Sequence, residues 1–370
     1  MCAGYSIAAA LDLTKNFHTD ILYTATMSKP PSVFVIAEIG QAHDGSLGIL
    51  HSYIDAVAKT GINAIKFQTH VAEAESSPLE LFRVKFSYVD ETRQDYWRRM
   101  EFTVEQWAGI KEHCEAVGLE FMSTPSCLAA VDILERVGVE RFKIGSGDMD
   151  NRLLLQRVAR TGKEIILSSG LSSFEEIDEA VRLISSFGNR LVVMQCTSDY
   201  PVAPSRTGLN LINTYRARYP HPIGLSDHSG TIYPSLAAVA MGASYIEIHT
   251  VFDRRMFGPD SASSIEIDEL KQMVSGIRII EQSLYSDFNK TYSDEHKRMR
   301  NMFGKTLCVR HAMSAGDVLK VDDLESKKPA GRGIPARDYE KVVGKSLCRD
   351  LIQWDFLRIE DISEDNREHD

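Results

Sequence analysis

The sequence has 370 residues, of which 43% are hydrophobic and 25% charged, as in a globular chain long enough for one large domain and a small one. Its formal net charge of −10 argues against a nucleic-acid partner, because such a surface needs clustered Lys and Arg. No apolar run approaches the ~20 residues of a membrane span. The six cysteines are scattered without C-x-x-C spacing, which is typical of the reducing cytoplasm.

Residues 1–30 come before any regular pattern. They contain the apolar stretch YSIAAALDL, but Asp12 interrupts it and no basic region precedes it, so a signal peptide is not expected. We expect residues 1–30 to form a disordered extension, with Met27 as an alternative start.

From Val33 onward, short apolar runs alternate with segments of helical periodicity. The segment 47–61 illustrates the second kind, since Leu50 and Ile54 lie on one apolar stripe and Gly61 is typical of a helix C-terminus. The apolar runs are residues 33–40, 64–70, 120–126, 141–147, 164–170, 191–198, 222–230 and 245–252.

Eight strand candidates, each followed by a helix candidate over roughly 250 residues, predict a (β/α)8 TIM barrel at residues 31–286. An open doubly wound sheet also alternates strands and helices. It usually has five or six strands and a Gly-rich phosphate turn, and no G-x-G-x-x-G sequence is present. The pattern therefore favours the barrel.

The alternation stops around Ser283. The charged stretch 287–302 is predicted to be a linker or a bridging helix. Residues 303–365 combine short β-like pieces with Gly and Pro turns, which predicts a small β-rich module. A module of about 60 residues is marginal as an independent fold, so we expect it to pack on another surface.

Catalytic groups of a TIM barrel lie at the C-terminal ends of its strands. The predicted strand ends carry polar residues throughout, namely Glu38, Gln41, His43, Lys66, Gln68, Ser123, Thr124, Lys143, Ser146, Ser168, Ser169, Thr197, Ser198, Tyr200, Ser226, Asp227, His228, Glu247 and His249. The loop after the last strand adds Asp253 and Asp260.

Two histidines, His228 and His249, end successive strands. Neighbouring strands lie ~4.8 Å apart, so both imidazoles could bind one metal ion. The alternative is a pair of unrelated, hydrogen-bonded structural histidines.

Two lysines, Lys66 and Lys143, lie close to the strand ends. A lysine inside a barrel is unfavourable unless it meets an anion, and with the neighbouring hydroxyls the pair indicates a pocket for phosphate and carboxylate. Structural ion pairs with Glu38 or Asp148 are the alternative, and the alternation I-K-F-Q leaves open whether Lys66 points into the barrel or toward a helix. Together these residues favour metal-assisted chemistry on a small phosphate ester.

A set of short motifs occurs in a fixed order along the chain. They are AEIGQAHDG, IKFQTH, FMSTP, FKIGSGD, ILSSG, QCTSDYP, IGLSDHSG, IEIHTVFDR and GPDSASS. In this order they resemble the sialic acid synthase family, the N-acetylneuraminate synthases. The sequences KKPAGRGI and VVGK are similar to the antifreeze-like (SAF) domain of that family, and the resemblance covers about residues 31–362.

The resemblance implies condensation of phosphoenolpyruvate with an N-acylated amino sugar, such as N-acetylmannosamine in its open-chain aldehyde form, to give a sialic acid-type nonulosonate and phosphate. It implies catalytic roles for Glu38, His228 and His249, with the two histidines binding Mn²⁺ or Mg²⁺. The implied phosphoenolpyruvate contacts are Lys66, Thr124, Lys143, Ser146, Ser168 and Ser226. The implied sugar contacts are Gln68, Tyr200, Asp260 and Lys328. The resemblance also implies a domain-swapped homodimer, in which the SAF module of one chain covers the barrel mouth of the other.

Four positions depart from the family pattern, and all fall on the sugar side. They are Ala42, Ser198 and Ser261 in the barrel and Lys328 in place of an arginine, with Arg332 close by. The identity of the sugar therefore stays open, and pseudaminic or legionaminic acid synthases that use diacetamido sugars are alternatives. A barrel that binds a sugar acid without turnover and a synthase for heptulosonate or octulosonate sugars are further alternatives.

Overall fold

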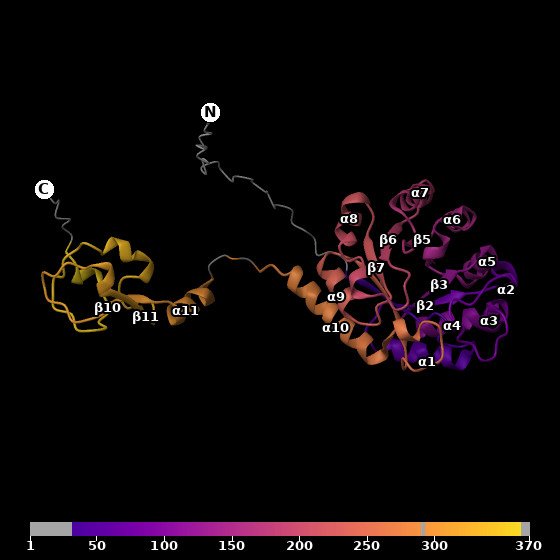
Figure 1. Cartoon of the computed structure of the whole chain (residues 1–370), viewed down its shortest axis with the longest axis horizontal. Coiled ribbons are helices and arrows are strands. Elements are labelled where there is room, and N and C mark those ends of the chain that lie inside the picture. The colour runs from indigo at the N-terminus through magenta and orange to yellow at the C-terminus, as the bar shows by residue number, and fades with distance from the viewer. Residues whose placement is uncertain (1–31, 289, 291–292, 364–370) are drawn as a thin grey trace, which may run out of the picture. The chain divides into compact units, whose positions relative to one another are not determined.

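The computed structural model describes residues 32–288, 290 and 293–363, so the predicted extension at residues 1–30 lies outside the described residues. The chain divides into two compact units, with the boundary between Ser286 and Asp287. Figure 1 labels the elements of each unit.

The first unit is a closed parallel barrel. Its strands are β1 Phe34–Glu38, β2 Ala64–Thr69, β3 Glu120–Pro125, β4 Arg141–Ile144, β5 Glu164–Ser168, β6 Leu191–Cys196, β7 Ile223–Asp227 and β8 Tyr245–Val251. They pair in chain order, and β1 also pairs with β8, which closes the barrel. Each predicted apolar run contains one strand, so the TIM-barrel prediction is confirmed.

Helices surround these strands (Figure 1). They are α1 Leu47–Ala58, α2 Ala72–Glu75, α3 Arg93–Met100, α4 Val104–Ala116, α5 Leu128–Val137, α6 Arg152–Ala159, α7 Phe174–Ser185, α8 Leu211–Arg218, α9 Tyr233–Ala240 and α10 Ile267–Leu284. Two features were not predicted. Residues 70–103, which we call the β2–α4 excursion, contain α2 and α3, and the short strand β9, Ile265–Glu266, pairs with β8.

Helix α1 shows how the local sequence determines an element. The Ser46 side chain caps its N-terminus by accepting the backbone N–H of Ile49. Leu50 and Ile54 of the predicted stripe are fully buried. The helix ends at Ala58, earlier than predicted, and Gly61 instead adopts a φ of 81° in the turn that leads into β2.

Strand residues alternate between two cores. Side chains such as Val35, Ile65 and Phe67 belong to the large cluster packed with the barrel helices. A smaller cluster that includes Ile36, Ala64, Met122, Ile166, Val192 and Met194 has the opposite parity along the strands. Because successive side chains point to opposite faces, the second set fills the barrel interior.

The same parity decides which polar residues face the barrel interior. Three polar residues each follow a residue of this smaller cluster by two positions: Glu38 follows Ile36, Thr124 follows Met122 and Ser168 follows Ile166. Lys66 follows Ala64 in the same way. These side chains therefore point into the barrel interior at its C-terminal end.

The second unit has its own small core. Helix α11, Asp294–Phe303, occupies the later part of the segment predicted as a linker or helix, and β10 Thr306–Val309 pairs antiparallel with β11 Leu324–Lys327. The core residues are Leu307, Val309, Met313, Leu319, Ile334, Val342, Leu347, Leu351, Leu357 and Ile362. A small antiparallel sheet is therefore present, and its assignment as a SAF domain stays a prediction.

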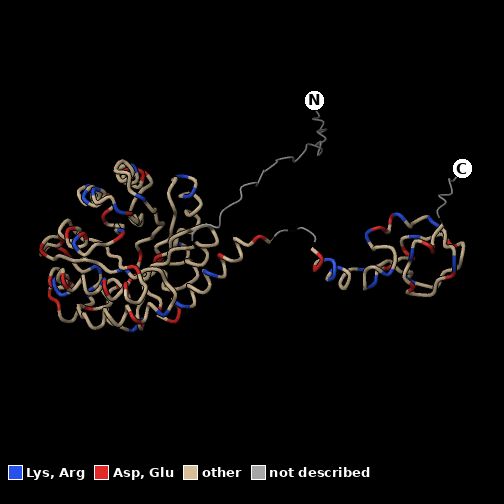
Figure 2. The backbone as a smooth tube through the Cα atoms, turned by 180° about the vertical axis from the view of Figure 1, so that it is seen from behind, with Lys and Arg blue, Asp and Glu red and all other residues tan. Residues whose placement is uncertain are grey.

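The surface of the barrel carries mixed charge. Figure 2 shows acidic and basic residues interspersed along the helices of the first unit. None of the helices that the structure describes is long and apolar enough to cross a membrane.

Candidate active site

A cavity of about 340 Å³ opens where the C-terminal ends of the barrel strands meet. Its lining residues are Glu38, Lys66, Gln68, Arg83, Thr124, Lys143, Gly145, Ser146, Gly147, Ser168, Leu171, Cys196, Ser198, Tyr200, Ser226, His228, Glu247 and His249. All the residues to which the family resemblance gives a role are among them except Asp260 and Lys328. Of the other polar residues at the predicted strand ends and the last loop, the lining does not include Gln41, His43, Ser123, Ser169, Thr197, Asp227 and Asp253. The structure thus brings together residues from every barrel strand.

Strand register explains this convergence. Glu38 at the end of β1 lies beside Lys66 of β2 on one side and beside His249 of β8 on the other. Ser226 of β7 lies beside Glu247 of β8. Because the strands are parallel, residues paired in this register lie at the same height along the barrel axis and point to the same interior face.

A buried cluster of charged groups forms the floor of the cavity. Lys66 Nζ lies 2.6 Å from Glu38 Oε2 and 3.6 Å from Glu247 Oε1, and it donates a hydrogen bond to Thr124 Oγ1 at 3.1 Å. Lys143 Nζ lies 2.8 Å from Glu247 Oε1. Two carboxylates therefore face two ammonium groups away from bulk water.

The protonation of this cluster follows from its own charges. Burial alone would lower the pKa of Lys66, but the negative charges of Glu247 and Glu38 outweigh it and raise that pKa. Burial would raise the pKa of Glu247, but Lys143 and Lys66 lower it. Lys66 and Glu247 are therefore both ionised at neutral pH.

These contacts decide between the alternatives left open by the sequence. Lys66 points into the barrel interior, and its predicted ion pair with Glu38 is present. Lys143 pairs with Glu247, whereas Asp148 accepts a hydrogen bond from the side chain of Asn151 at 3.0 Å. The structural ion pairs are thus present, and a role of the two lysines in binding phosphate and carboxylate stays a prediction.

The two histidines lie side by side, with ring centroids 5.2 Å apart. His228 Nδ1 donates to the backbone carbonyl of Thr197 at 2.9 Å, so the neutral ring carries its lone pair on Nε2. Burial chiefly lowers the pKa of His249, which favours its neutral, ligating form. Within residues 32–288, 290 and 293–363, no group of three or more His, Cys, Asp or Glu side chains could hold a metal ion. The pair fits a divalent cation that takes its other ligands from substrate or water.

Polar and aromatic side chains form the wall next to the histidines. Tyr200 stacks on His228 with ring centroids 4.2 Å apart. Gln68 Nε2 donates to Glu38 Oε1 at 2.8 Å. Asp260 is near the same place, because a Cβ on Gly40 would lie 3.7 Å from Asp260 Oδ2 and 3.6 Å from both Glu38 Oε1 and Gln68 Nε2.

Hydroxyl groups line the side of the cavity formed by β4, β5 and β6. Ser146 Oγ accepts the backbone N–H of Gly170 at 2.9 Å, and Ser168 Oγ is buried without a protein partner among the described residues. A Cβ on Gly170 would collide with Ser198 and lie 2.7 Å from Ser146 Oγ. Glycine therefore lets the backbone approach these hydroxyls closely.

The predicted sugar contact Lys328 belongs to the second unit. Its Nζ lies 5.3 Å from the ring centroid of Phe303, and the neighbouring Arg332 lines a separate hollow of about 660 Å³ in the same unit. The roles of both residues at the sugar stay predictions.

Sequence reasoning missed Arg83 as a site residue and left Glu247 unassigned. Arg83 comes from the β2–α4 excursion, whose irregular pattern indicated no strand end, so no signal identified it. Glu247 precedes His249 by two positions on the same strand, and that period could have placed it on the same interior face.

Residues 53–288 match the NeuB family. This chain belongs to that family. The N,N'-diacetyllegionaminic acid synthase of Campylobacter jejuni is 31% identical over 88% of this chain and 98% of the relative. The human N-acetylneuraminate-9-phosphate synthase is also 31% identical, over 85% of this chain and 88% of the relative.

A solved structure of the family has the same fold. The crystal structure of the N-acetylneuraminic acid (sialic acid) synthetase from Leptospira borgpetersenii serovar Hardjo-bovis, in complex with citrate, superposes with a TM-score of 0.64. The two chains are 32% identical, and the match covers 72% of this chain and 90% of that chain.

Proposed function

We propose that this protein condenses phosphoenolpyruvate with an N-acylated amino sugar, N-acetylmannosamine or a relative, to give a sialic acid-type nonulosonate and phosphate. One observation carries the proposal. In a member of the NeuB family, a single barrel-end cavity combines two buried lysines and several hydroxyls on one side with two histidines and a tyrosine on the other.

The lysine side suits the anionic substrate. Lys66 and Lys143 would neutralise the phosphate and carboxylate of phosphoenolpyruvate, while Thr124, Ser146, Ser168 and Ser226 would donate hydrogen bonds to their oxygens. Ser168 has a hydroxyl with no protein partner among the described residues, so it is available to the substrate. These side chains would bind the phosphate and carboxylate groups, whose negative charge persists throughout the reaction.

The histidine side suits a Lewis acid. His228 and His249 would hold a divalent cation, which when bound polarises the aldehyde oxygen of the sugar. Of Mn²⁺ and Mg²⁺, the imidazole pair favours Mn²⁺, because Mg²⁺ prefers oxygen ligands. Gln68, Tyr200 and Asp260 would orient the sugar beside the enol carbon.

The bond changes follow from these positions. The enol carbon of phosphoenolpyruvate attacks the aldehyde carbon, water adds to C2, and the tetrahedral carbon releases phosphate by cleavage of its carbon–oxygen bond. Glu38 lies at the strand end between Lys66 and His249, where its carboxylate can accept the proton of the attacking water.

A legionaminic acid-type reaction with a diacetamido sugar is the second candidate, and a pseudaminic acid-type reaction is a third. Ser198, one of the positions that depart from the family pattern, lines the cavity.

A panel assay tests the proposal. Wild-type protein is incubated with phosphoenolpyruvate, Mn²⁺ and each amino sugar in turn, and phosphate release and product mass are measured. We expect release only with an acceptor sugar, loss with EDTA, and transfer of bridging ¹⁸O from phosphoenolpyruvate into phosphate. Absence of release with every sugar, or label retained in the sugar acid, would overturn the reaction.

We also propose a cytoplasmic homodimer in which the second unit of one chain serves the barrel of the other. All five cysteines that the structure describes are free, which suits a reducing compartment. The excursion exposes Leu79, Leu81 and Tyr88, each more than four-fifths exposed, and such an apolar surface supports burial against a second chain.

A further inference from the structure

The β2–α4 excursion has a small core of its own. Tyr96 and Trp97 of α3 pack with Ala72 and Met100, and Phe82 and Phe86 of the preceding loop pack against them. The Arg93 guanidinium lies 4.1 Å from the centroid of the Trp97 ring. The loop is therefore anchored by aromatic side chains on both sides of residue 83.

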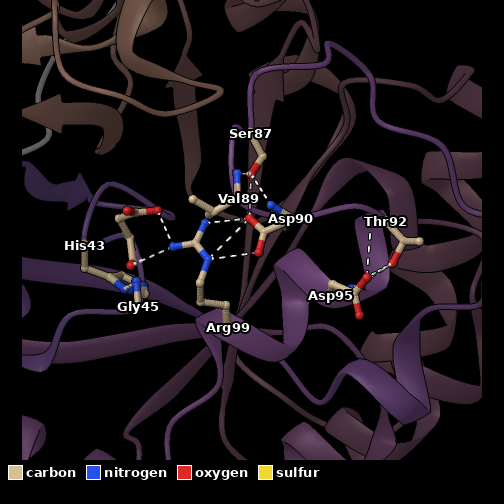
Figure 3. A network of polar contacts seen from close by, with 9 residues as sticks. His43, Gly45, Ser87, Val89, Asp90, Thr92, Asp95 and Arg99 are labelled. Atoms are coloured by element: carbon tan, nitrogen blue, oxygen red, sulfur yellow. Dashed lines mark hydrogen bonds and ion pairs between the residues drawn. The ribbon is translucent and has the colours of Figure 1, made fainter.

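Arg99 fastens the excursion to the loop after β1 (Figure 3). Its Nη1 donates to Asp44 Oδ1 at 2.6 Å, and its Nη2 donates to Asp90 Oδ2 at 2.7 Å. Ser87 Oγ donates to the same oxygen of Asp90 at 2.6 Å. The hydrogen bond with Arg99 chiefly lowers the pKa of Asp90, so the pair stays charged at neutral pH. Figure 3 shows Arg99 beside Asp90, and its bond to Asp44 connects the excursion to the loop after β1.

This anchored loop carries Arg83 into the cavity wall. Arg83 Nη2 donates to Asp260 Oδ1 at 2.9 Å and to the carbonyl of Pro259 at 3.1 Å. Its guanidinium carbon lies 4.2 Å from the centroid of the Tyr200 ring, the ring that also stacks on His228. One side chain thus connects the excursion, the loop after β6 and the loop after β8.

The contacts leave specific atoms available to a ligand. Arg83 occupies Oδ1 of Asp260, whereas Oδ2 lies toward Gly40, close to Glu38 and Gln68. In the described part of the chain, Nε and Nη1 of Arg83 have no hydrogen-bond partner, and the side chain is 45% exposed. Arg83 therefore contacts both Asp260 and Tyr200 while it lines the cavity itself.

We propose that Arg83 is the positioning residue of the sugar subsite, which orients Asp260 and Tyr200 for the acceptor and thereby contributes to the choice of sugar. The inference rests on the proposed function, because it takes the acceptor to be the amino sugar. Arg83 acts through two side chains on the histidine side and contacts none of the residues proposed to bind phosphoenolpyruvate. Loss of Arg83 therefore weakens the binding of the sugar and leaves the binding of phosphoenolpyruvate unchanged.

The test compares Arg83→Ala and Arg83→Lys with Arg98→Ala. Arg98 is a matched control, since it lies on the same excursion, is 49% exposed and pairs with Glu73 and Asp95. For Arg83→Ala we expect a ~10- to 100-fold rise in KM for the sugar, with KM for phosphoenolpyruvate and the thermal midpoint near wild type. Arg83→Lys retains the charge opposite Asp260 but not the planar fork, so an intermediate effect is expected. Arg98→Ala leaves both KM values unchanged.

A double-mutant cycle separates positioning from general damage. If Arg83 acts through Asp260, Arg83→Ala in an Asp260→Ala background adds much less than it does alone. Equal rises in both KM values, additive effects with Asp260→Ala, or an unchanged sugar KM in Arg83→Ala would each overturn the inference. In these cases wild-type turnover still supports the proposed function, whereas a wild-type chain that releases no phosphate with any sugar overturns the proposed function itself.

Discussion

At the scale of single residues, Glu247 is the centre of the buried charge cluster. It lies next to both cavity lysines and accepts a hydrogen bond from Ser226 at 3.2 Å. Its Oε2 is buried without a hydrogen-bond partner among the described residues. The carboxylate therefore balances two positive charges before any substrate arrives.

Removal of this carboxylate should destabilise the protein. In Glu247→Ala the two ammonium groups lose a buried counter-charge, and we expect the free energy of unfolding to fall by about 3–5 kcal/mol. Urea unfolding at pH 7 measures the change. Glu115→Ala is the control, because Glu115 forms an exposed i,i+4 pair with Lys111 and should contribute only about 0–1 kcal/mol. Equal effects of the two substitutions would contradict the role of Glu247.

The residues of the cavity differ in how well the sequence predicts them. Lys66 and His249 could be predicted because catalytic barrels use the strand ends, although the alternation along β2 left the direction of Lys66 open. Arg83 could not, because its position depends on the aromatic core of an irregular loop. Long-range packing of that kind leaves no periodic signal in the sequence.

At the scale of elements, helices α1 and α4 meet through a pair of histidines. His51 Nδ1 and His113 Nδ1 lie 2.7 Å apart, so one ring donates and the other accepts. Asp55 lies 3.0 Å from His113 Nε2. This hydrogen bond needs one of the two facing nitrogens to be unprotonated.

The pair should make stability depend on pH. Burial chiefly lowers the pKa of His51, and the charge of His113 lowers it further, although Asp55 opposes them. The folded pKa is therefore below the unfolded value of about 6.5, so the contribution to stability is present above that pH and is lost as the pH falls. In His51→Gln we expect a smaller loss of stability between about pH 7.5 and 5.5 than in the wild type, measured by urea midpoints.

The control for this pH dependence is His296→Gln on the exposed surface of α11. It should keep the wild-type dependence. A His51→Gln variant with the wild-type slope would show that the histidine pair does not titrate as argued.

Elements with strong periodicity were predicted, and those without it were not. The eight strands follow from β-branched runs bounded by turn residues. Helix α3 was missed because its sequence, RQDYWRRM, combines charges with aromatic residues that pack on a local cluster rather than the main core. The end of α1 was misplaced because Gly61 serves the following turn.

At the scale of the whole molecule, the two units have separate hydrophobic cores. The residues that line the cavity described above belong to the barrel unit. The proposed dimer would give the second unit a role, as a cover for the partner's barrel mouth.

Mixing two inactive variants tests that role. A chain truncated after Phe288 retains an intact barrel but has no second unit, while His249→Ala retains the second unit with a disabled barrel. In a mixed dimer the second unit of the His249→Ala chain can cover the barrel mouth of the truncated chain, so partial phosphate release should return. A mixture of His228→Ala and His249→Ala should stay inactive, because each barrel lacks a histidine of its own. The test requires that circular dichroism shows the truncated chain to be folded and that affinity tags verify mixed dimers. Failure to recover activity would then rule out a role of the second unit at the partner's barrel.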